Sequence, residues 1–186
     1  CAPASLQTRT PGTLTIGADN PAYPPYYQPS DPNPEPWELG DPTNRQGFEG
    51  QVAWTIARNL GFVGDTVTWV VAPFNTVVAP GKKAFDFDVN QVSISDERKQ
   101  AVDFSSGYYD VRQAAITRKG RPIDGTTTVA RLQAAQLGAQ VGTTSYTAIT
   151  DQIQPSEDPG VFDTNDQAVQ ALQNGQIDGI VVDLPT

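Results

Sequence analysis

Apolar positions along the chain follow two alternating periodicities, one typical of strands and one typical of helices. In the first half, strands are expected at 14–17, 66–71 and 85–92, and a helix at 48–60 that ends at Gly61. A helical segment is expected after Arg98, as far as about Ala101. In the second half, strands are expected at 113–117, 139–142 and 177–182, and helices at 129–137 (ended by Gly138), 144–153 and 166–173. Thr164 and Gln167 have the spacing of a capping box before the last helix. The alternation predicts an α/β protein with parallel or mixed sheets, in which ligands bind at the carboxyl ends of the strands.

Residues 28–46 interrupt this alternation with a segment rich in Pro, Asp and Asn. Such a composition favours turns and loops over regular elements. Trp37 is the main apolar residue of the segment, so we expect it to anchor a surface excursion.

The polar stretch that ends at Arg98 carries the most distinctive candidate chemistry. Ser95 suits a helix N-cap and the two acidic residues after it suit the positive end of a helix, but Arg98 does not. A residue that departs from a local rule often has a functional role, and the fork of an Arg beside backbone N–H groups is suited to a carboxylate. The residues alone leave two interpretations of Arg98, a ligand contact or a solvated surface residue.

Composition and charge narrow the range of functions. The 186 residues carry a formal net charge of −9, which argues against a nucleic-acid partner, and no run approaches the roughly 18 consecutive apolar residues of a spanning helix. With no His and one Cys, the chain cannot form a Ser-His-Asp triad or a structural zinc site, and it has no Gly-rich phosphate loop. We therefore expect no cofactor, no metal and no enzymatic activity.

The segment NQVSISDERKQAVDFSSGYY resembles the signature of the periplasmic solute-binding proteins of polar amino-acid ABC transporters, bacterial extracellular solute-binding protein family 3. Further similar segments occur in the expected order, namely LTIGADNPAYPPYY, GFEGQVAWTIARNLG, VGTTSYTA and IDGIVVDLP. The resemblance implies an α/β, two-lobe periplasmic-binding-protein-like (type II) fold with a hinge. It also implies extracytoplasmic binding of a polar amino acid by cleft closure, delivery to the membrane subunits of an ABC importer, and a monomer.

The resemblance also implies a division of the chain. Lobe 1 is expected at 13–110, lobe 2 at 111–183 and the start of a return hinge at 184–186, so that the first lobe lacks its C-terminal closing segment. Cys1, followed by Ala-Pro-Ala-Ser, is typical of a bacterial lipoprotein after signal-peptide cleavage. We expect Cys1 to carry lipid and to tether a flexible leader, residues 1–12, to the membrane surface; a boundary that happens to fall at this Cys is the alternative.

Site residues in lobe 1 follow from the same resemblance. It implies that Arg98 holds the α-carboxylate of the ligand, with Ser93 beside it, and that the backbone carbonyl of Gln91 accepts from the α-ammonium group. Tyr23 and Phe74 would be aromatic walls for the ligand's side chain. Packing within a loop and within the core are the structural alternatives for these two aromatic residues.

Lobe 2 supplies the complementary groups in this prediction. Asp183 would take the α-ammonium group, and Thr144 would bring a backbone N–H at a helix start to the carboxylate. The alternatives are a turn residue for Asp183 and helix caps for Thr143 and Thr144. Asp19 and Glu49 slightly favour a polar or cationic side chain on the ligand, but the sequence does not name the amino acid.

Two other functions remain open at this point. Some dehydratases acting on arogenate or prephenate share the fold implied by the resemblance, and such an enzyme would need a catalytic carboxylate or Lys in the cleft. A ligand-sensing domain of a receptor is the other alternative.

Overall fold

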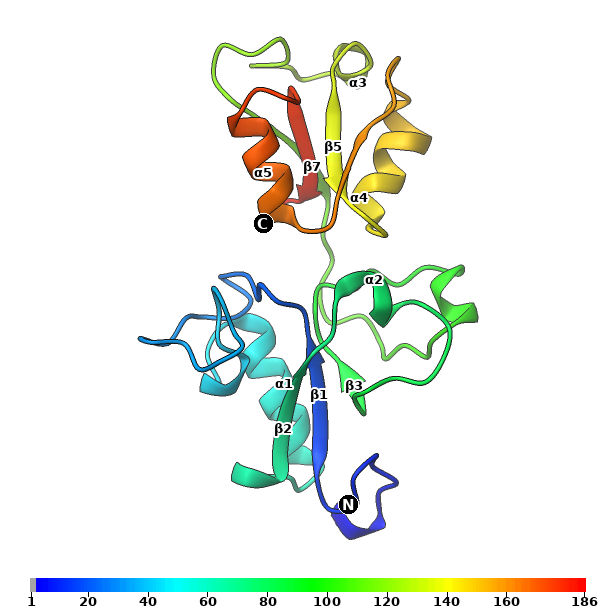
Figure 1. The fold of residues 1–186 in the computed structure, drawn as a ribbon. Coiled ribbons are helices and arrows are strands. Elements are labelled where there is room, and N and C mark those ends of the chain that lie inside the picture. Colours follow the sequence, from blue (N-terminus) through cyan, green and yellow to red (C-terminus); the bar gives the residue numbers. More distant parts are fainter. Residues whose placement is uncertain (1–2) are drawn as a thin grey trace. The chain divides into compact units, whose positions relative to one another are not determined.

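The computed structural model describes residues 3–186, which divide into two compact units (Figure 1). Unit 1 ends at Ser106 and unit 2 begins at Gly107, and the lobe bounds that the resemblance implies stay a prediction. Each unit has its own sheet. The fold is therefore mixed α/β, as the alternation of strands and helices indicates.

Unit 1 is built on a three-stranded parallel sheet in the order β2-β1-β3. The strands are β1 (Leu14–Ala18), β2 (Val67–Val71) and β3 (Phe87–Asp88), and the main helix is α1 (Phe48–Asn59). All five residues of β1 are buried, and Ala53 and Ala57 of α1 share one core cluster with Leu14 and Ile16 of that strand. The small side chains of the helix allow it to approach the central strand closely.

The start of α1 depends on Gly47, which precedes the helix with a φ of 88°. A Cβ at this position would lie 2.3 Å from the backbone oxygen of Tyr26. Gly47 is therefore required both by the left-handed backbone conformation and by the close approach of another segment. At the other end, the helix stops at Asn59 and Gly61 follows with a φ of 91°, as predicted.

The excursion at 28–46 is folded around a buried aspartate. Asp41 accepts hydrogen bonds from the backbone N–H of Thr43 at 2.8 Å, from the Thr43 hydroxyl at 2.6 Å and from the Ser30 hydroxyl at 2.6 Å. A 3₁₀ turn, Pro42–Asn44, follows it. Trp37 is 6% exposed and packs with Tyr26 and Tyr27, which confirms its predicted role as the anchor.

Unit 2 contains a four-stranded sheet in the order β4-β7-β5-β6. The elements are β4 (Gln113–Thr117), α3 (Val129–Leu132), β5 (Leu137–Gln140), α4 (Thr144–Thr147), β6 (Gly160–Phe162), α5 (Asn165–Gln173) and β7 (Gly179–Asp183). Strand β4 is antiparallel to β7, whereas β5 is parallel to both β6 and β7. A single π-helical segment, Ala148–Ile153, continues α4.

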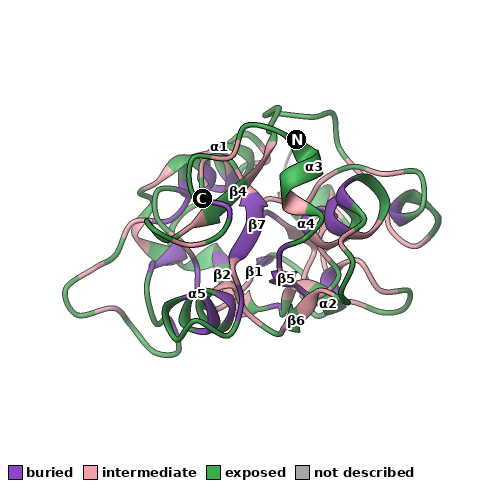
Figure 2. Ribbon diagram, turned by 90° about the horizontal axis from the view of Figure 1, so that it is seen from above, coloured by how far each residue is buried: buried purple, intermediate pink, exposed green. Residues whose placement is uncertain are grey.

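Strand β7 is buried on both of its faces (Figure 2, purple). Val181 belongs to one core cluster with Ile149 beyond α4, whereas Ile180 and Val182 belong to another cluster with Leu172 of α5. Successive residues of a strand point to opposite faces, so a continuous apolar run is what a strand covered on both sides needs. The predicted buried strand at 177–182 is confirmed, shifted by a residue or two.

Several predicted elements differ from the structure. The helix expected at 129–137 is a single turn, α3, and Gly138 lies inside strand β5, where a Cβ would stand 2.7 Å from the Phe162 ring. The strand expected at 85–92 is ordered as a ladder only at Phe87–Asp88, and after Arg98 there is only a 3₁₀ turn, Arg98–Gln100. The one-turn helix α2 (Phe74–Val77) and strand β6 were not predicted.

The N-cap predicted for the last helix is present in an altered form. The Thr164 hydroxyl accepts from the backbone N–H of Gln167 at 3.3 Å, as expected, but the Gln167 amide oxygen accepts from the N–H of Asp163 at 3.0 Å instead of Thr164. Near the chain start, a 3₁₀ turn spans Pro3–Ser5 and Leu6 packs partly against the core of unit 1. The boundary of the leader after residue 12 stays a prediction, and the lipidation predicted at Cys1 lies outside the described residues.

Candidate ligand-binding site

In unit 1, the structure brings three of the predicted site residues together around the guanidinium of Arg98. Its Nη1 atom donates to the backbone carbonyl of Ser93 at 2.7 Å, and its central carbon lies 5.6 Å from the centroid of the Phe74 ring. Arg98 is 9% exposed, so the charged group is largely removed from water. The alternative of a solvated surface Arg is therefore wrong, and the guanidinium has a defined orientation within its own unit.

Arg98 is positioned locally by a turn and not by a helix. The Ser95 hydroxyl accepts from the backbone N–H of Arg98 at 3.2 Å, as a cap would. However, the segment that follows is a 3₁₀ turn of three residues, Arg98–Gln100. The predicted contribution of a helix dipole does not apply to so short a segment, because aligned peptide dipoles accumulate only over several turns.

Gln91 is held by a residue that the sequence associated with the ligand's side chain. Glu49, in the first turn of α1 and 1% exposed, accepts from the backbone N–H of Gln91 at 2.7 Å, and its second carboxylate oxygen accepts from the Gln91 side-chain amide. Gln91 has a φ of 46°, in the left-handed region. Two hydrogen bonds to one carboxylate stabilise this conformation, which a residue with a Cβ rarely adopts. Sequence reasoning missed this contact because 42 residues separate the two partners.

The tyrosine-rich loop after β1 contains two tyrosines that pack in the core and one that is a candidate ligand contact. Tyr26 and Tyr27 are buried, and the Tyr27 hydroxyl donates to the backbone carbonyl of Val89. Tyr23 is half-buried, and its carbonyl accepts from the N–H groups of Tyr26 and Tyr27 at 3.0 and 3.1 Å. The loop is therefore packed as a turn, and the aromatic-wall role of Tyr23 stays a prediction.

Asp88 on β3 is a buried carboxyl group that sequence reasoning did not single out as such. Both of its carboxylate oxygens are out of contact with solvent and have no hydrogen-bond partner. Burial raises the pKa of Asp88 well above its usual range, the carboxylates of Glu49 and Asp19 raise it further, and Lys83 acts in the opposite direction. A Cβ on Gly17 would lie 2.8 Å from the nearer Asp88 oxygen, so this glycine makes room for the carboxyl group.

In unit 2, Asp183 is part of a chain of side-chain hydrogen bonds. It ends strand β7 directly opposite Gln113, which begins strand β4. The Gln113 side-chain nitrogen donates to the Asp183 carboxylate at 2.6 Å, and the Ser145 hydroxyl donates to the Gln113 side-chain oxygen at 2.6 Å. Ser145 lies in the first turn of α4, immediately after Thr144. The structure therefore connects Asp183 to the helix start at which the sequence placed Thr144.

Thr143 and Thr144 have different positions at this helix start. Thr143 is the N-cap of α4, and its hydroxyl accepts from the backbone N–H of Tyr146 at 3.2 Å. Thr144 is the first residue of the helix. The capping alternative is correct for Thr143, and the ligand contact of Thr144 stays a prediction.

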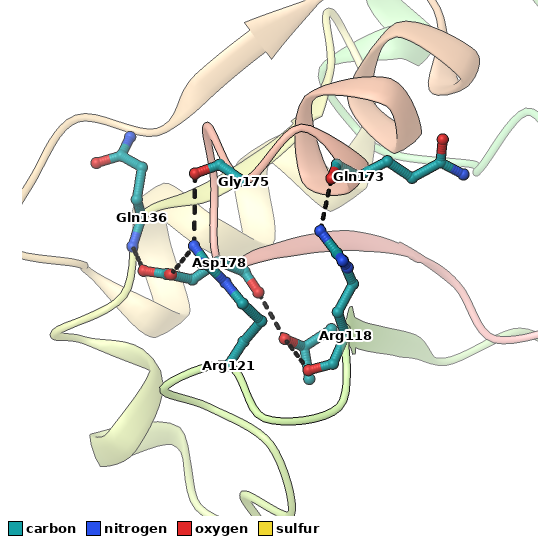
Figure 3. A network of polar contacts seen from close by, with 7 residues as sticks. Arg118, Arg121, Gln136, Gln173, Gly175 and Asp178 are labelled. Carbon is teal, nitrogen blue, oxygen red and sulfur yellow. Dashed lines mark hydrogen bonds and ion pairs between the residues drawn. The ribbon is translucent and has the colours of Figure 1, made fainter.

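The other end of the β4–β7 ladder is fixed by a structural network around Asp178 (Figure 3). Arg121 forms an ion pair with Asp178 at 2.9 Å, and the backbone N–H of Gln136 donates to the same carboxylate at 3.1 Å. Arg118 donates to the carbonyl of Gln173 at the end of α5. These contacts join the loop after β4 to the end of α5 and the start of β7. None of them involves a predicted site residue.

Residues 3–186 contain neither a metal-binding cluster nor a helix that could span a membrane. Within that range, no group of three or more His, Cys, Asp or Glu side chains is arranged to hold a metal ion. Within the same range, no helix has the length and apolar character needed to cross a membrane.

A mixed α/β chain of two units, each with its own sheet, has the fold of the two-lobe, type II periplasmic binding proteins. The model of the bacterial extracellular solute-binding proteins, family 3, matches residues 14–182, and the chain belongs to that family. The relationship predicted from the sequence motifs is therefore confirmed.

Individual relatives agree with this assignment. The L-cystine-binding protein TcyJ of Escherichia coli (strain K12) is 31% identical over 176 residues, which are 92% of this chain and 59% of that protein. An ancestral arginine-binding protein solved with bound glutamine has a TM-score of 0.74 and 27% identity, over 94% of this chain and 71% of that one. The chain thus spans about three fifths of the length of the cystine-binding relative.

A further solved structure bears on the enzymatic alternative. The ancestral amino acid-binding protein AncCDT-1, described as a precursor of cyclohexadienyl dehydratase, has a TM-score of 0.73 and 26% identity, over 94% of this chain and 72% of that one. That neighbour is itself described as an amino acid-binding protein. No observation on the present chain favours a dehydratase.

Proposed function

We propose that this protein binds a polar amino acid outside the cytoplasm and delivers it to the membrane subunits of an ABC importer. Membership of the solute-binding family supports the binding role, and relatives described as cystine- and arginine-binding proteins support an amino acid as the ligand. The observation that carries the proposal is that, in each unit, hydrogen bonds orient the charged side chain to which the resemblance assigns one end of the ligand. The two side chains are Arg98 in unit 1 and Asp183 in unit 2.

The two side chains have charges opposite to those of the ligand. An amino acid loses its water on binding, so its carboxylate and its ammonium group each need a partner of opposite charge. We assign the carboxylate to Arg98 and the ammonium to Asp183. The closure of a cleft around the ligand, which the resemblance implies, is part of the same proposal.

The remaining roles follow from the resemblance and are part of the proposal. Ser93 and Thr144 would contact the ligand's carboxylate, the carbonyl of Gln91 would accept from its ammonium group, and Tyr23 and Phe74 would line its side chain. The position of Phe74 against the Arg98 guanidinium supports its inclusion, because an aromatic face stabilises a cation without occupying its N–H donors.

The membrane anchor and the monomeric state also belong to the proposal. Lipid on Cys1 would keep the protein at the outer membrane surface next to its transporter. Cys1→Ser in the protein expressed with its signal peptide should move it from the membrane fraction to the soluble fraction. An unchanged distribution would contradict the anchor without affecting the binding role.

The test of binding is a thermal-shift screen against the twenty amino acids, followed by calorimetry for the strongest stabiliser. A ligand that binds only the native state raises its melting temperature by mass action. L-cystine, L-arginine and L-glutamine are the first compounds to examine. If no amino acid stabilises the protein, the proposed function is wrong.

Arg98→Ala should weaken binding about 100-fold or more, because it removes the partner of a buried carboxylate. Arg45→Ala is the matched control, since the Arg45 guanidinium also lies over an aromatic ring of unit 1, at 4.2 Å from the Trp54 centroid, but belongs to no predicted site. Retained affinity in Arg98→Ala, or an equal loss in Arg45→Ala, would remove Arg98 from the site.

Asp183→Asn should weaken the amino acid far more than the matched carboxylic acid that lacks the α-ammonium group. The reason is that the substitution removes only the negative charge that faces the ammonium. Calorimetric titration of both compounds into both proteins gives the comparison. Equal losses for the two compounds would exclude the ammonium role of Asp183.

A further inference from the structure

The hydrogen bonds around Gln113 join three elements of unit 2 at one point. Gln113 and Asp183 are paired across the antiparallel β4–β7 ladder, and Ser145 comes from the first turn of α4. Each of the two side-chain hydrogen bonds of Gln113 measures 2.6 Å. Ser145 is 7% exposed, so the distant end of the chain of hydrogen bonds lies in the interior of the unit.

The chemistry of the three groups gives this chain of hydrogen bonds one direction. An ionised carboxylate only accepts hydrogen bonds, so the amide nitrogen of Gln113 faces Asp183. The amide oxygen must then face Ser145, whose hydroxyl has to donate to it. Because both ends of the amide are occupied, the Gln113 side chain holds the nearer Asp183 oxygen in one position.

We propose that Gln113 is a positioning residue for amino-acid recognition, which orients the Asp183 carboxylate toward the ligand's ammonium group and is itself held by Ser145. The inference rests on the proposed function. A neutral amide suits this role because it orients a carboxylate without bringing a positive charge of its own to compete with the ammonium. Asp178, at the other end of the same ladder, differs in this respect because it forms an ion pair with Arg121.

The test compares Gln113→Leu with a control at the other end of strand β4. Gln113→Leu removes both hydrogen bonds and keeps most of the side-chain volume. Thr117→Val removes the 2.6 Å hydrogen bond from the Thr117 hydroxyl to the Asp178 carbonyl, so it also deletes a side-chain contact between β4 and the start of β7. The probes are whichever of L-cystine, L-arginine and L-glutamine stabilises the wild type most, and the carboxylic acid that lacks its α-ammonium group.

We expect Gln113→Leu to weaken binding of the amino acid about tenfold, the usual size for a lost hydrogen bond to a charged group. Affinity for the carboxylic acid should change less than twofold, and Thr117→Val should leave both affinities unchanged. This difference between the two probes separates a positioning role from a structural one, because a general loss of stability weakens both probes together. Ser145→Ala provides the same comparison if Gln113→Leu does not fold, with a smaller loss in the same direction.

Each other outcome overturns a defined part of the reasoning. If the wild type binds the amino acid and Gln113→Leu binds it equally well, or loses both probes in parallel, the positioning role is wrong and the proposed function stands. If the wild type binds no amino acid, the proposed function fails and this inference fails with it.

Discussion

Asp88→Asn tests the physical account of unit 1 most directly, because Asp88 is a buried carboxyl group without a hydrogen-bond partner. Burial is the main reason that the pKa of Asp88 lies above its usual range, and the neighbouring carboxylates of Glu49 and Asp19 act in the same direction. Lys83 lowers the pKa but does not reverse the shift. Asparagine has nearly the same shape as the neutral acid and cannot ionise.

The sign of the effect follows from proton linkage. In the unfolded chain Asp88 titrates near its ordinary pKa of about 3.9, whereas in the folded protein it holds its proton to a higher pH. Between the two pKa values the folded state binds more protons, so Asp88 makes stability fall as pH rises, by up to about 1.4 kcal/mol per pH unit. The fall stops above the folded pKa. Asp88→Asn removes this contribution and should be more stable than the wild type at neutral pH.

Urea unfolding at a series of pH values from 4 to 8 measures the difference. The free energy of unfolding of Asp88→Asn, minus that of the wild type, should increase as the pH rises through this window. Asp86→Asn is the control, since Asp86 accepts from the backbone N–H groups of Arg9 and Thr15, each at 2.7 Å. That variant should be less stable at neutral pH by about 1 kcal/mol for a lost hydrogen bond. Parallel pH profiles for the wild type and Asp88→Asn would refute the reasoning.

Two further predictions concern the backbone around the site. Glu49→Gln should lower the free energy of unfolding by about 1–3 kcal/mol. The two carboxylate oxygens of Glu49 accept from the backbone N–H and the side-chain amide of Gln91, whereas an amide has only one oxygen that can accept. Chemical denaturation measures the loss, and a variant as stable as the wild type would contradict the prediction. Gly47→Ala should cost at least about 1 kcal/mol, since its φ of 88° and the 2.3 Å approach of the Tyr26 oxygen leave no room for a Cβ. Gly64→Ala is the control, because Gly64 has a φ of 53° but a Cβ there would have no atom within 4 Å. It should lower the melting temperature less than Gly47→Ala does. Equal effects of the two substitutions would mean that the steric contact at Gly47 is unimportant.

The elements that the sequence predicted well are those with a strong local pattern. The run Ile180–Val182 predicts a strand buried on both faces, and it packs against different clusters through alternate residues. The helix prediction at 129–137 was wrong because the end of that segment belongs to strand β5 of the sheet. Leu137 and Gly138 pair with β7, and Gly138 lets the Phe162 ring approach where any Cβ would collide. Tertiary packing of this kind overrides helical spacing.

The candidate site also depends on contacts that a local sequence pattern does not predict. Arg98 could be singled out because it departs from a local capping rule, and the structure buries it beside the Phe74 ring. The partner of Gln113 lies 70 residues away, and no local pattern reveals the pairing. Only the register of β4 against β7 places Gln113 opposite Asp183. Contacts made across a sheet are set by strand pairing, which short-range periodicity does not encode.

If Arg98 takes the ligand's carboxylate and Asp183 its ammonium group, as proposed, the way in which the two side chains are held bears on selectivity. Arg98 is fixed by Ser93 and Phe74, and Asp183 by Gln113, in each case through contacts within one unit. Side chains that are already oriented lose little conformational entropy when a ligand binds, so such a pair can support affinity for the two charges that all α-amino acids share. It cannot distinguish one amino acid from another, because those charges are common to all of them. Discrimination must therefore depend on residues that face the variable side chain, and substitutions at Arg98 or Asp183 should reduce affinity for all bound amino acids by similar factors.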